Sequence, residues 1–340
     1  MIIIMVPQTT DEHVEGVVAR LDELGYGHHI SRGVERTLIG AIGAPEGEKE
    51  MVAEQLSVLP GVERVVPILK SYKLISREHN PRPVTVHIGD APVGGGHFAV
   101  VAGPCSVESR EQMVQTATAV KEAGAVGLRG GAYKPRTSPY SFQGLGPEGL
   151  EYLAAAREAS GLPVITEVMD VRQLEGILEV ADCLQIGARN MQNYDLLKEA
   201  GAAGKPVMLK RGFASTVEEW LKAAEYIASS GTLDVILCER GIRTFEPTTR
   251  FMLDLGGLAA ARRETFLPIV ADPSHAAGVS SLVPSLALAA VAGGADGLLI
   301  EVHPRPDQAL SDGPQSLTPA LFAELMKRIR QVAEAVGMQM

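Results

Sequence analysis

The chain has 340 residues, 46% of them hydrophobic, which is enough for about two domains with a substantial core and excludes a disordered chain. Its formal net charge of −10 at pH 7 argues against general binding to nucleic acid or to anionic membranes. The sequence has no stretch of about 20 uninterrupted apolar residues, so no transmembrane helix is expected.

The first 72 residues indicate a small α+β unit. The predicted order is strand, helix, strand, strand, helix, strand, with the two middle strands sharing one segment, over residues 1–7, 9–25, 28–43, 46–61 and 62–69. This β-α-β-β-α-β order is the ferredoxin-like pattern. Domains of this shape often bind small regulators, although the shape alone does not identify a ligand.

A segment rich in proline and glycine follows, over residues 73–96, and its composition indicates an irregular linker. We therefore expect a ferredoxin-like domain at 1–72, a linker at 73–96 and a second domain at 97–340. The N-terminal segment has no basic region of the kind that begins a signal peptide. The three cysteines are far apart and do not suggest a disulfide framework, so a cytoplasmic location is expected.

The second domain alternates short apolar runs with helical segments, and a helix at 318–337 closes the pattern. The apolar runs are nearly continuous, which is typical of parallel strands buried on both faces. Eight such units over roughly 240 residues favour a closed (β/α)8 TIM barrel, with an open doubly wound sheet as the alternative. The expected strands lie within 98–105, 125–131, 163–169, 183–188, 206–212, 234–241, 268–275 and 297–304.

Polar residues end each of these strands, where the catalytic groups of a (β/α)8 barrel lie. Cations dominate the set, and so many in one pocket would repel one another unless anions neutralise them. Arginine binds phosphate and carboxylate through a rigid fork, and lysine supplies a point charge. The pattern therefore predicts a substrate with several anionic groups, or two phosphorylated substrates, bound by Arg129, Lys134, Arg136, Arg189, Lys210 and Arg240.

A second group at the same strand ends has the residue types that bind a divalent transition metal: Cys105, His275, Glu301 and Asp312. Their spacing gives no motif, and each type also has an ordinary structural role. Cys105 can be a small buried side chain, His275 a helix cap, and Asp312 a turn residue. His303 follows Glu301 by two residues, so along a strand both side chains point the same way, toward the metal or the substrate.

Seven motifs in this order resemble 3-deoxy-D-arabino-heptulosonate 7-phosphate (DAHP) synthase, in the form with an N-terminal ferredoxin-like domain. They are GPCSVES (103–109), KPRTSPYSFQG (134–144), IGARNMQN (186–193), LKRG (209–212), ERGIRTF (239–245), DPSH (272–275) and EVHP (301–304). The resemblance implies condensation of phosphoenolpyruvate with erythrose 4-phosphate, the first step of the shikimate pathway to aromatic amino acids.

The resemblance also implies residue roles. Phosphoenolpyruvate would be held by Arg129, Lys134, Arg189, Lys210 and Arg240, and erythrose 4-phosphate by Arg136, Thr137 and Ser138. One divalent ion, with Mn, Fe, Co and Zn left open, would be held by Cys105, His275, Glu301 and Asp312. The expected catalytic residues are Lys134, Glu167 and His303.

Three competing functions stay open. The sister enzyme, 3-deoxy-manno-octulosonate 8-phosphate synthase, would use arabinose 5-phosphate, although the KPRTS segment at 134–138 resembles the heptulosonate enzymes. A Schiff-base aldolase would use Lys210, and a non-catalytic sensor would have lost the site. The family suggests a homo-oligomer, expected to be a tetramer, and the small domain suggests feedback regulation by tyrosine or phenylalanine.

Overall fold

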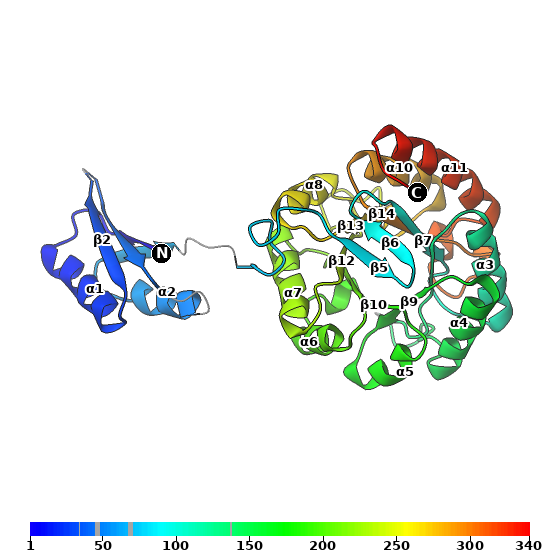
Figure 1. Cartoon of the computed structure of the whole chain (residues 1–340), viewed down its shortest axis with the longest axis horizontal. Helices are drawn as coiled ribbons and strands as arrows, with labels where there is room; N and C mark the ends of the chain where they lie inside the picture. The colour runs from blue at the N-terminus through cyan, green and yellow to red at the C-terminus, as the bar shows by residue number, and fades with distance from the viewer. Residues whose placement is uncertain (34, 45–47, 67–70, 137) are drawn as a thin grey trace. The chain divides into compact units, whose positions relative to one another are not determined.

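The structure is a computed structural model, and it describes residues 1–33, 35–44, 48–66, 71–136 and 138–340 (Figure 1). The chain forms two compact units, Met1–Ser71 and Tyr72–Met340. Within the described ranges, no helix combines the length and the apolar character that crossing a bilayer requires.

The N-terminal unit has the ferredoxin-like fold that the sequence predicts. Its elements are β1 (Ile2–Met5), α1 (Asp11–Glu23), β2 (Gly27–Arg32), β3 (Thr37–Ile42), α2 (Lys49–Ser57) and β4 (Val62–Val66). The strands form one antiparallel sheet in the order β2-β3-β1-β4. Thr10 caps α1, and Val14, Val17 and Leu21 recur on the buried face of this helix because helical neighbours lie three and four residues apart.

The second unit is the predicted (β/α)8 barrel, because its strands close on themselves and leave no open edge (Figure 1). Each strand pairs in parallel with its neighbours in the order β10-β11-β12-β13-β14-β7-β8-β9. The strands are β7 (Ala99–Gly103), β8 (Gly127–Arg129), β9 (Val164–Val168), β10 (Cys183–Ile186), β11 (Val207–Lys210), β12 (Val235–Glu239), β13 (Ile269–Ala271) and β14 (Gly297–Glu301). The closed barrel excludes the open doubly wound sheet.

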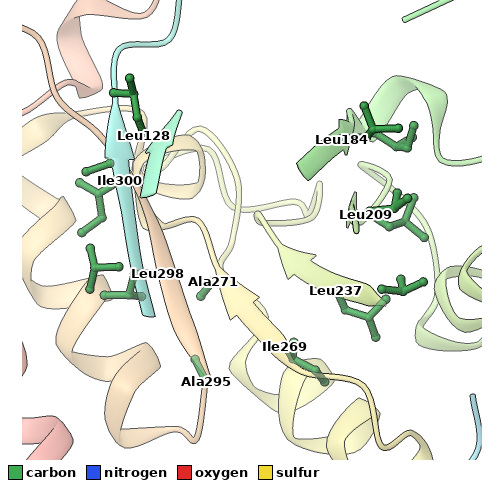
Figure 2. Close-up of a cluster of buried hydrophobic side chains, with 14 of the residues drawn as sticks. Leu128, Leu184, Leu209, Leu237, Ile269, Ala271, Ala295, Leu298 and Ile300 are labelled. Carbon is green, nitrogen blue, oxygen red and sulfur yellow. The ribbon is translucent and has the colours of Figure 1, made fainter. Parts of the chain in front are cut away.

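A helix follows each barrel strand and covers the outside of the barrel (Figure 1). The helices are α3 (Arg110–Glu122), α4 (Pro147–Ser160), α5 (Leu174–Leu178), α6 (Tyr194–Ala202), α7 (Val217–Ser230), α8 (Leu255–Glu264), α10 (Val283–Ala292) and α11 (Pro319–Ala335), with a short additional helix α9 (Pro273–Ala277) after β13. Alternate strand residues pack outward against them. Figure 2 shows Leu184, Leu209 and Leu237 of this apolar layer on three successive strands.

The segment 73–96, expected as a linker, belongs to the barrel unit and contains a hairpin of β5 (Thr85–Ile88) and β6 (Ala91–Gly94). Val86, Ile88 and Val93 are fully buried with the first inward side chains of the barrel strands. The hairpin therefore fills the amino-terminal end of the barrel, across which it lies in Figure 1. Pro92 is tolerated because a two-stranded hairpin has free edges that need no N–H donor.

Residues just before the hairpin are fastened to the outside of the barrel. The carboxylate of Glu225 on α7 accepts hydrogen bonds from the backbone N–H groups of Lys73, Leu74 and Ile75, at 2.9, 2.9 and 3.2 Å. The Ile75 side chain is completely buried, and the Tyr72 hydroxyl donates to Glu264 at 2.9 Å. The barrel unit thus begins at Tyr72, and these contacts contribute to its stability.

Two truncations should differ measurably in stability. Removing residues 1–71 keeps the hydrogen bonds to Glu225 and Glu264 and the burial of Ile75. Removing residues 1–80 loses the burial of Ile75, which is worth about 2 kcal/mol, and the hydrogen bonds to Glu225. We expect the longer deletion to lower the urea midpoint of the barrel. Equal midpoints for the two truncated proteins would show that the segment contributes nothing.

Candidate active site and metal centre

A cavity of about 410 Å³ opens at the carboxyl ends of the barrel strands. Most residues that the sequence assigns to a site line this cavity, although they come from seven different strands or the loops after them. They are Arg129, Lys134, Arg136, Ser138, Glu167, Arg189, Lys210, Arg240, His275 and Asp312. Cys105 and Glu301 lie directly beneath it, buried against Lys134 and Arg129. Thr137 falls outside the residues that the structure describes.

Alternation along the strands decides which polar residues reach the cavity. Cys238 of β12 faces the barrel interior, so Arg240, two residues later, continues on the inner side. Lys210 of β11 also faces inward. The neighbouring residues Arg211 and Glu239 face the helices instead and form a buried ion pair at 2.8 Å. Arg211 therefore organises the barrel wall, and Lys210 serves the cavity.

Four donor groups converge at the cavity floor. One ligand atom from each of Cys105, His275, Glu301 and Asp312 lies within 4.8 Å of all the others. His275 Nε2 is 3.4 Å from Glu301 Oε1 and 3.7 Å from Asp312 Oδ2, while Cys105 Sγ is 3.2 Å from that same Asp312 oxygen. Asp312 has the left-handed backbone angle φ of 50°, which turns its carboxylate back toward the cysteine.

The surroundings of these donors suit a bound cation. Asp272 Oδ2 lies 2.7 Å from His275 Nδ1, which fixes the proton on Nδ1 and leaves the Nε2 lone pair facing the cluster. Burial lowers the pKa of His275, so its imidazole is neutral, as a metal ligand must be. Burial, reinforced by Glu301, raises the pKa of the Cys105 thiol to about 12, so a thiolate there requires a nearby positive ion.

The thiol, imidazole and two carboxylates thus form a mixed sulfur, nitrogen and oxygen set that fits a divalent transition metal. Asp272 itself caps α9, so capping is not what places His275 at this position. Asp312 does lie at a sharp turn, and this turn is how it reaches the cluster. The turn at Asp312 is therefore present, but a structural role of this kind does not exclude metal binding by the four residues.

Three cations on the cavity floor are held by buried partners. Arg129 Nη1 lies 2.6 Å from Glu301 Oε1, and Lys210 Nζ lies 2.6 Å from Asp272 Oδ2. Lys134 Nζ donates to the Cys105 carbonyl at 2.9 Å and lies 3.2 Å from its sulfur. All three are at most 5% exposed. These contacts fix the cations in place, so they need no reorganisation when an anion binds.

Glu167 reaches the cavity from β9 because residue 187 is a glycine. A Cβ atom at Gly187 would lie 2.0 Å from Glu167 Oε1, so any larger residue would displace the carboxylate. Gln185, on the neighbouring strand, lies beside Glu167 and also lines the cavity. The carboxylate is therefore positioned among the cations, within the field of Lys134.

His303 does not line the cavity among the residues that the structure describes. It lines a separate hollow of about 240 Å³, where its Nε2 lies 3.3 Å from Glu108 Oε2 and its Nδ1 accepts a hydrogen bond from the Arg305 backbone at 3.0 Å. The other Glu108 oxygen accepts from the Leu310 backbone at 2.8 Å. His303 and Glu108 thus fasten the loop that carries Asp312.

Sequence reasoning missed several residues of the cavity. Arg243 and Arg250 lie in the long loop after β12, and Phe213 and Phe251 lie next to them. The one available signal was the length of this loop, since long loops at this end of a barrel carry function. Gln185 could have been found because it has the same inward register as Glu167.

The chain matches two family models, the DAHP synthase ferredoxin-like domain over residues 1–70 and the DAHP synthetase I family over residues 76–337. It is 50% identical over 339 residues to a phospho-2-dehydro-3-deoxyheptonate aldolase of Thermotoga maritima, covering 100% of this chain and 99% of the relative. A 2-dehydro-3-deoxyphosphooctonate aldolase of Syntrophotalea carbinolica is 37% identical over 69% of this chain and 91% of its own length.

Solved structures agree with these sequence matches. The crystal structure of the Thermotoga maritima phospho-2-dehydro-3-deoxyheptonate aldolase (DAHP synthase) superposes with a TM-score of 0.95 at 50% identity, covering 99% of this chain and 98% of that one. A truncated form of the Thermotoga maritima 3-deoxy-D-arabino-heptulosonate 7-phosphate synthase gives 0.74 at 49% identity, covering 79% of this chain and 99% of that one. The chain therefore belongs to the DAHP synthetase I family and carries the ferredoxin-like domain of DAHP synthases at its N-terminus.

Proposed function

We propose that this protein is a metal-dependent DAHP synthase that condenses phosphoenolpyruvate with erythrose 4-phosphate and releases inorganic phosphate. The observation that carries the proposal is the convergence of a four-donor cluster and a cationic cavity at one end of the barrel. Two phosphates and a carboxylate need such a density of cations, and an aldehyde needs an electrophilic partner. Full-length similarity to the Thermotoga maritima enzyme supports the same reaction.

Cys105, His275, Glu301 and Asp312 would hold one divalent ion in this account. When bound, the ion supplies Lewis-acid polarisation of a carbonyl oxygen. Asp272 and Arg129 would orient two of the ligands, since they contact His275 and Glu301 directly. The mixed donor set accepts manganese, iron, cobalt or zinc, and availability in the cell decides among them.

The cations of the cavity divide between the two substrates. Phosphoenolpyruvate would bind to the inner set, Arg129, Lys134, Arg189, Lys210 and Arg240. Erythrose 4-phosphate would bind with its phosphate toward Arg136 and Ser138 at the rim, together with Thr137. The two substrates are anions that repel each other in solution. Binding both in one cavity at the end of the barrel would lower the barrier to their reaction by several kcal/mol.

Two further groups, Glu167 and Lys134, would take part in the bond changes. The methylene carbon of phosphoenolpyruvate bonds to the aldehyde carbon, and the aldehyde oxygen takes up a proton. Water adds to the neighbouring carbon, which bears the phosphate, and gives up a proton. Phosphate then leaves with cleavage of the bond between that carbon and its bridging oxygen. Glu167 would position the water and accept its proton, since it is the carboxylate that faces the cavity from β9. Lys134 would move a proton to or from the reacting oxygens, which fits its fixed place above Cys105.

Substrate choice is tested by phosphate release. With phosphoenolpyruvate present, erythrose 4-phosphate should support turnover and arabinose 5-phosphate should not. The reverse preference would make the protein a 3-deoxy-manno-octulosonate 8-phosphate synthase, the reaction to which the 37% identical relative's name points. Absence of phosphate release with either aldose, in metal-replete protein, would favour the non-catalytic sensor.

The ferredoxin-like domain is proposed to bind an inhibitory aromatic amino acid, tyrosine or phenylalanine, in a homo-oligomer. The presence of the domain and the pathway that the reaction opens support this proposal. Turnover should survive deletion of residues 1–71, and inhibition by the amino acid should disappear. Equal inhibition of the truncated protein would place the effector elsewhere.

Glu108 provides a prediction about metal affinity. Because it fastens both His303 and the Leu310 backbone of the loop that carries Asp312, Glu108→Gln should raise the dissociation constant for Zn²⁺ by about tenfold. The measurement is competition with a chromophoric chelator. Glu111→Gln, in the first turn of α3, is the control, and equal affinities in the two variants would show that the loop needs no such fastening.

A further inference from the structure

Two phenylalanines form part of the otherwise polar cavity wall. The rings of Phe213, after β11, and Phe251, in the loop after β12, stack with centroids 5.2 Å apart and planes inclined by 8°. An apolar pair of this kind would not be needed to bind phosphates. The position of this aromatic pair among arginines therefore needs another explanation.

Guanidinium groups surround this pair. Arg240 Cζ lies 4.1 Å from the centroid of Phe251 and 5.0 Å from that of Phe213. Arg189 and Arg243 lie 5.2 and 5.6 Å from the Phe213 centroid. Distances within about 6 Å allow the negative face of an aromatic ring to attract a cation.

Arg240 depends on these rings more than the other buried cations do. It is 3% exposed, and its hydrogen bond to the Gly241 carbonyl is long, at 3.4 Å. Arg129 and Lys210 have carboxylate partners at 2.6 Å, whereas no described carboxylate forms an ion pair with Arg240. Burial lowers the pKa of Arg240 to about 10, and the attraction of Asp272 offsets this effect only in part.

The backbone holds both rings in place. Phe251 N donates to the Ala276 carbonyl at 2.9 Å, and Arg243 N donates to the Phe213 carbonyl at 2.6 Å. Gly241, with φ of 89°, gives Phe251 its room, since a Cβ atom there would lie 2.6 Å from Cβ of Phe251. The pair is therefore a rigid platform, built by two loops against the end of β12.

We propose that Phe213 and Phe251 are positioning residues, which hold Arg240 and Arg243 as a cationic face for a phosphate or carboxylate group, with no ion pair to a described carboxylate. A carboxylate could also hold these arginines, but it would cancel the charge that the ligand needs. An aromatic face attracts the cations and leaves their charge for the anion. The inference rests on the proposed function for the identity of the substrate, and on the geometry for the anion site.

The test replaces Phe251 with mono-, di- and trifluorophenylalanine, which keep the size of the ring and progressively remove its negative face. Dissociation constants for inorganic phosphate and for phosphoenolpyruvate without aldose should rise stepwise, reaching about tenfold for the trifluorinated ring. The turnover number at saturating substrates should stay within about twofold, because the proposed role of the rings is to hold the arginines and not to take part in the bond changes. Phe251→Leu should weaken binding similarly.

Two controls separate the ring's charge distribution from its packing. The same fluorinated residues at Phe322, buried in the core on α11 with no described arginine over its ring, should leave anion binding unchanged. Met252→Leu, the neighbour of Phe251 in the same loop, should also leave it unchanged. Unchanged affinity in the fluorinated Phe251 series, or equal losses at Phe322, overturns the inference. If phosphate binding responds as expected but no product forms, the proposed function fails and the inference stands.

Discussion

Replacing His275 by alanine is expected to lower turnover by at least about a thousandfold, since it removes a ligand from the centre that supplies electrophilic catalysis. The imidazole is the one nitrogen donor of the cluster, and Asp272 already fixes its orientation. The measurement combines steady-state phosphate release with the metal content of the purified variant. We expect both to fall together.

His87→Ala is the matched control, because His87 is an exposed histidine on the hairpin at the opposite end of the barrel. That variant should keep its metal and its turnover. If the His275→Ala variant loses its metal and still releases phosphate at the rate of the unaltered protein, the metal centre is not needed for turnover.

Replacing Lys210 by methionine is expected to cost about 3–5 kcal/mol of stability, because it leaves a buried charge without its partner. The Lys210 and Asp272 side chains are 5% and 1% exposed, and their charged atoms are 2.6 Å apart. Loss of the cation should also abolish binding of phosphoenolpyruvate. Urea denaturation and phosphate release measure the two effects separately.

A double variant tests the buried ion pair, and a trapping experiment tests the alternative role of Lys210 in a Schiff-base aldolase. Lys210→Met combined with Asp272→Asn removes both charges, so stability should recover in part while turnover stays lost. A Schiff-base aldolase would instead be trapped by borohydride in the presence of substrate. Trapping of Lys210 in the unaltered protein, or full stability of the single variant, would contradict the role given to this pair.

The barrel and the residues at its mouth were predictable from the sequence for a physical reason. Parallel strands buried on both faces are nearly continuous apolar runs, and the residues that end them meet at one edge. The alternation of inward and outward residues along each strand predicts more than the positions of the strand ends do. It separates the inward Lys210 and Arg240 from the outward Arg211 and Glu239, which pair with each other.

Other parts of the structure are not indicated by any local pattern in the sequence. The hairpin that fills the barrel has the proline and glycine content of a linker, and its burial is decided by contacts with strands far along the chain. The stacked Phe213 and Phe251 are 38 positions apart, and each alone resembles an ordinary core residue. His303 follows strand β14 and contacts Glu108, and no local sequence pattern indicates this contact between residues far apart in the chain.

Metal titration of stripped enzyme tests the central claim most directly, that Cys105, His275, Glu301 and Asp312 form one catalytic metal site beside the cationic cavity. Phosphate release from phosphoenolpyruvate and erythrose 4-phosphate should vanish on chelation and return as a divalent metal is added. Recovery should be complete at one ion per chain. Undiminished turnover in protein verified to be free of metal would contradict the account.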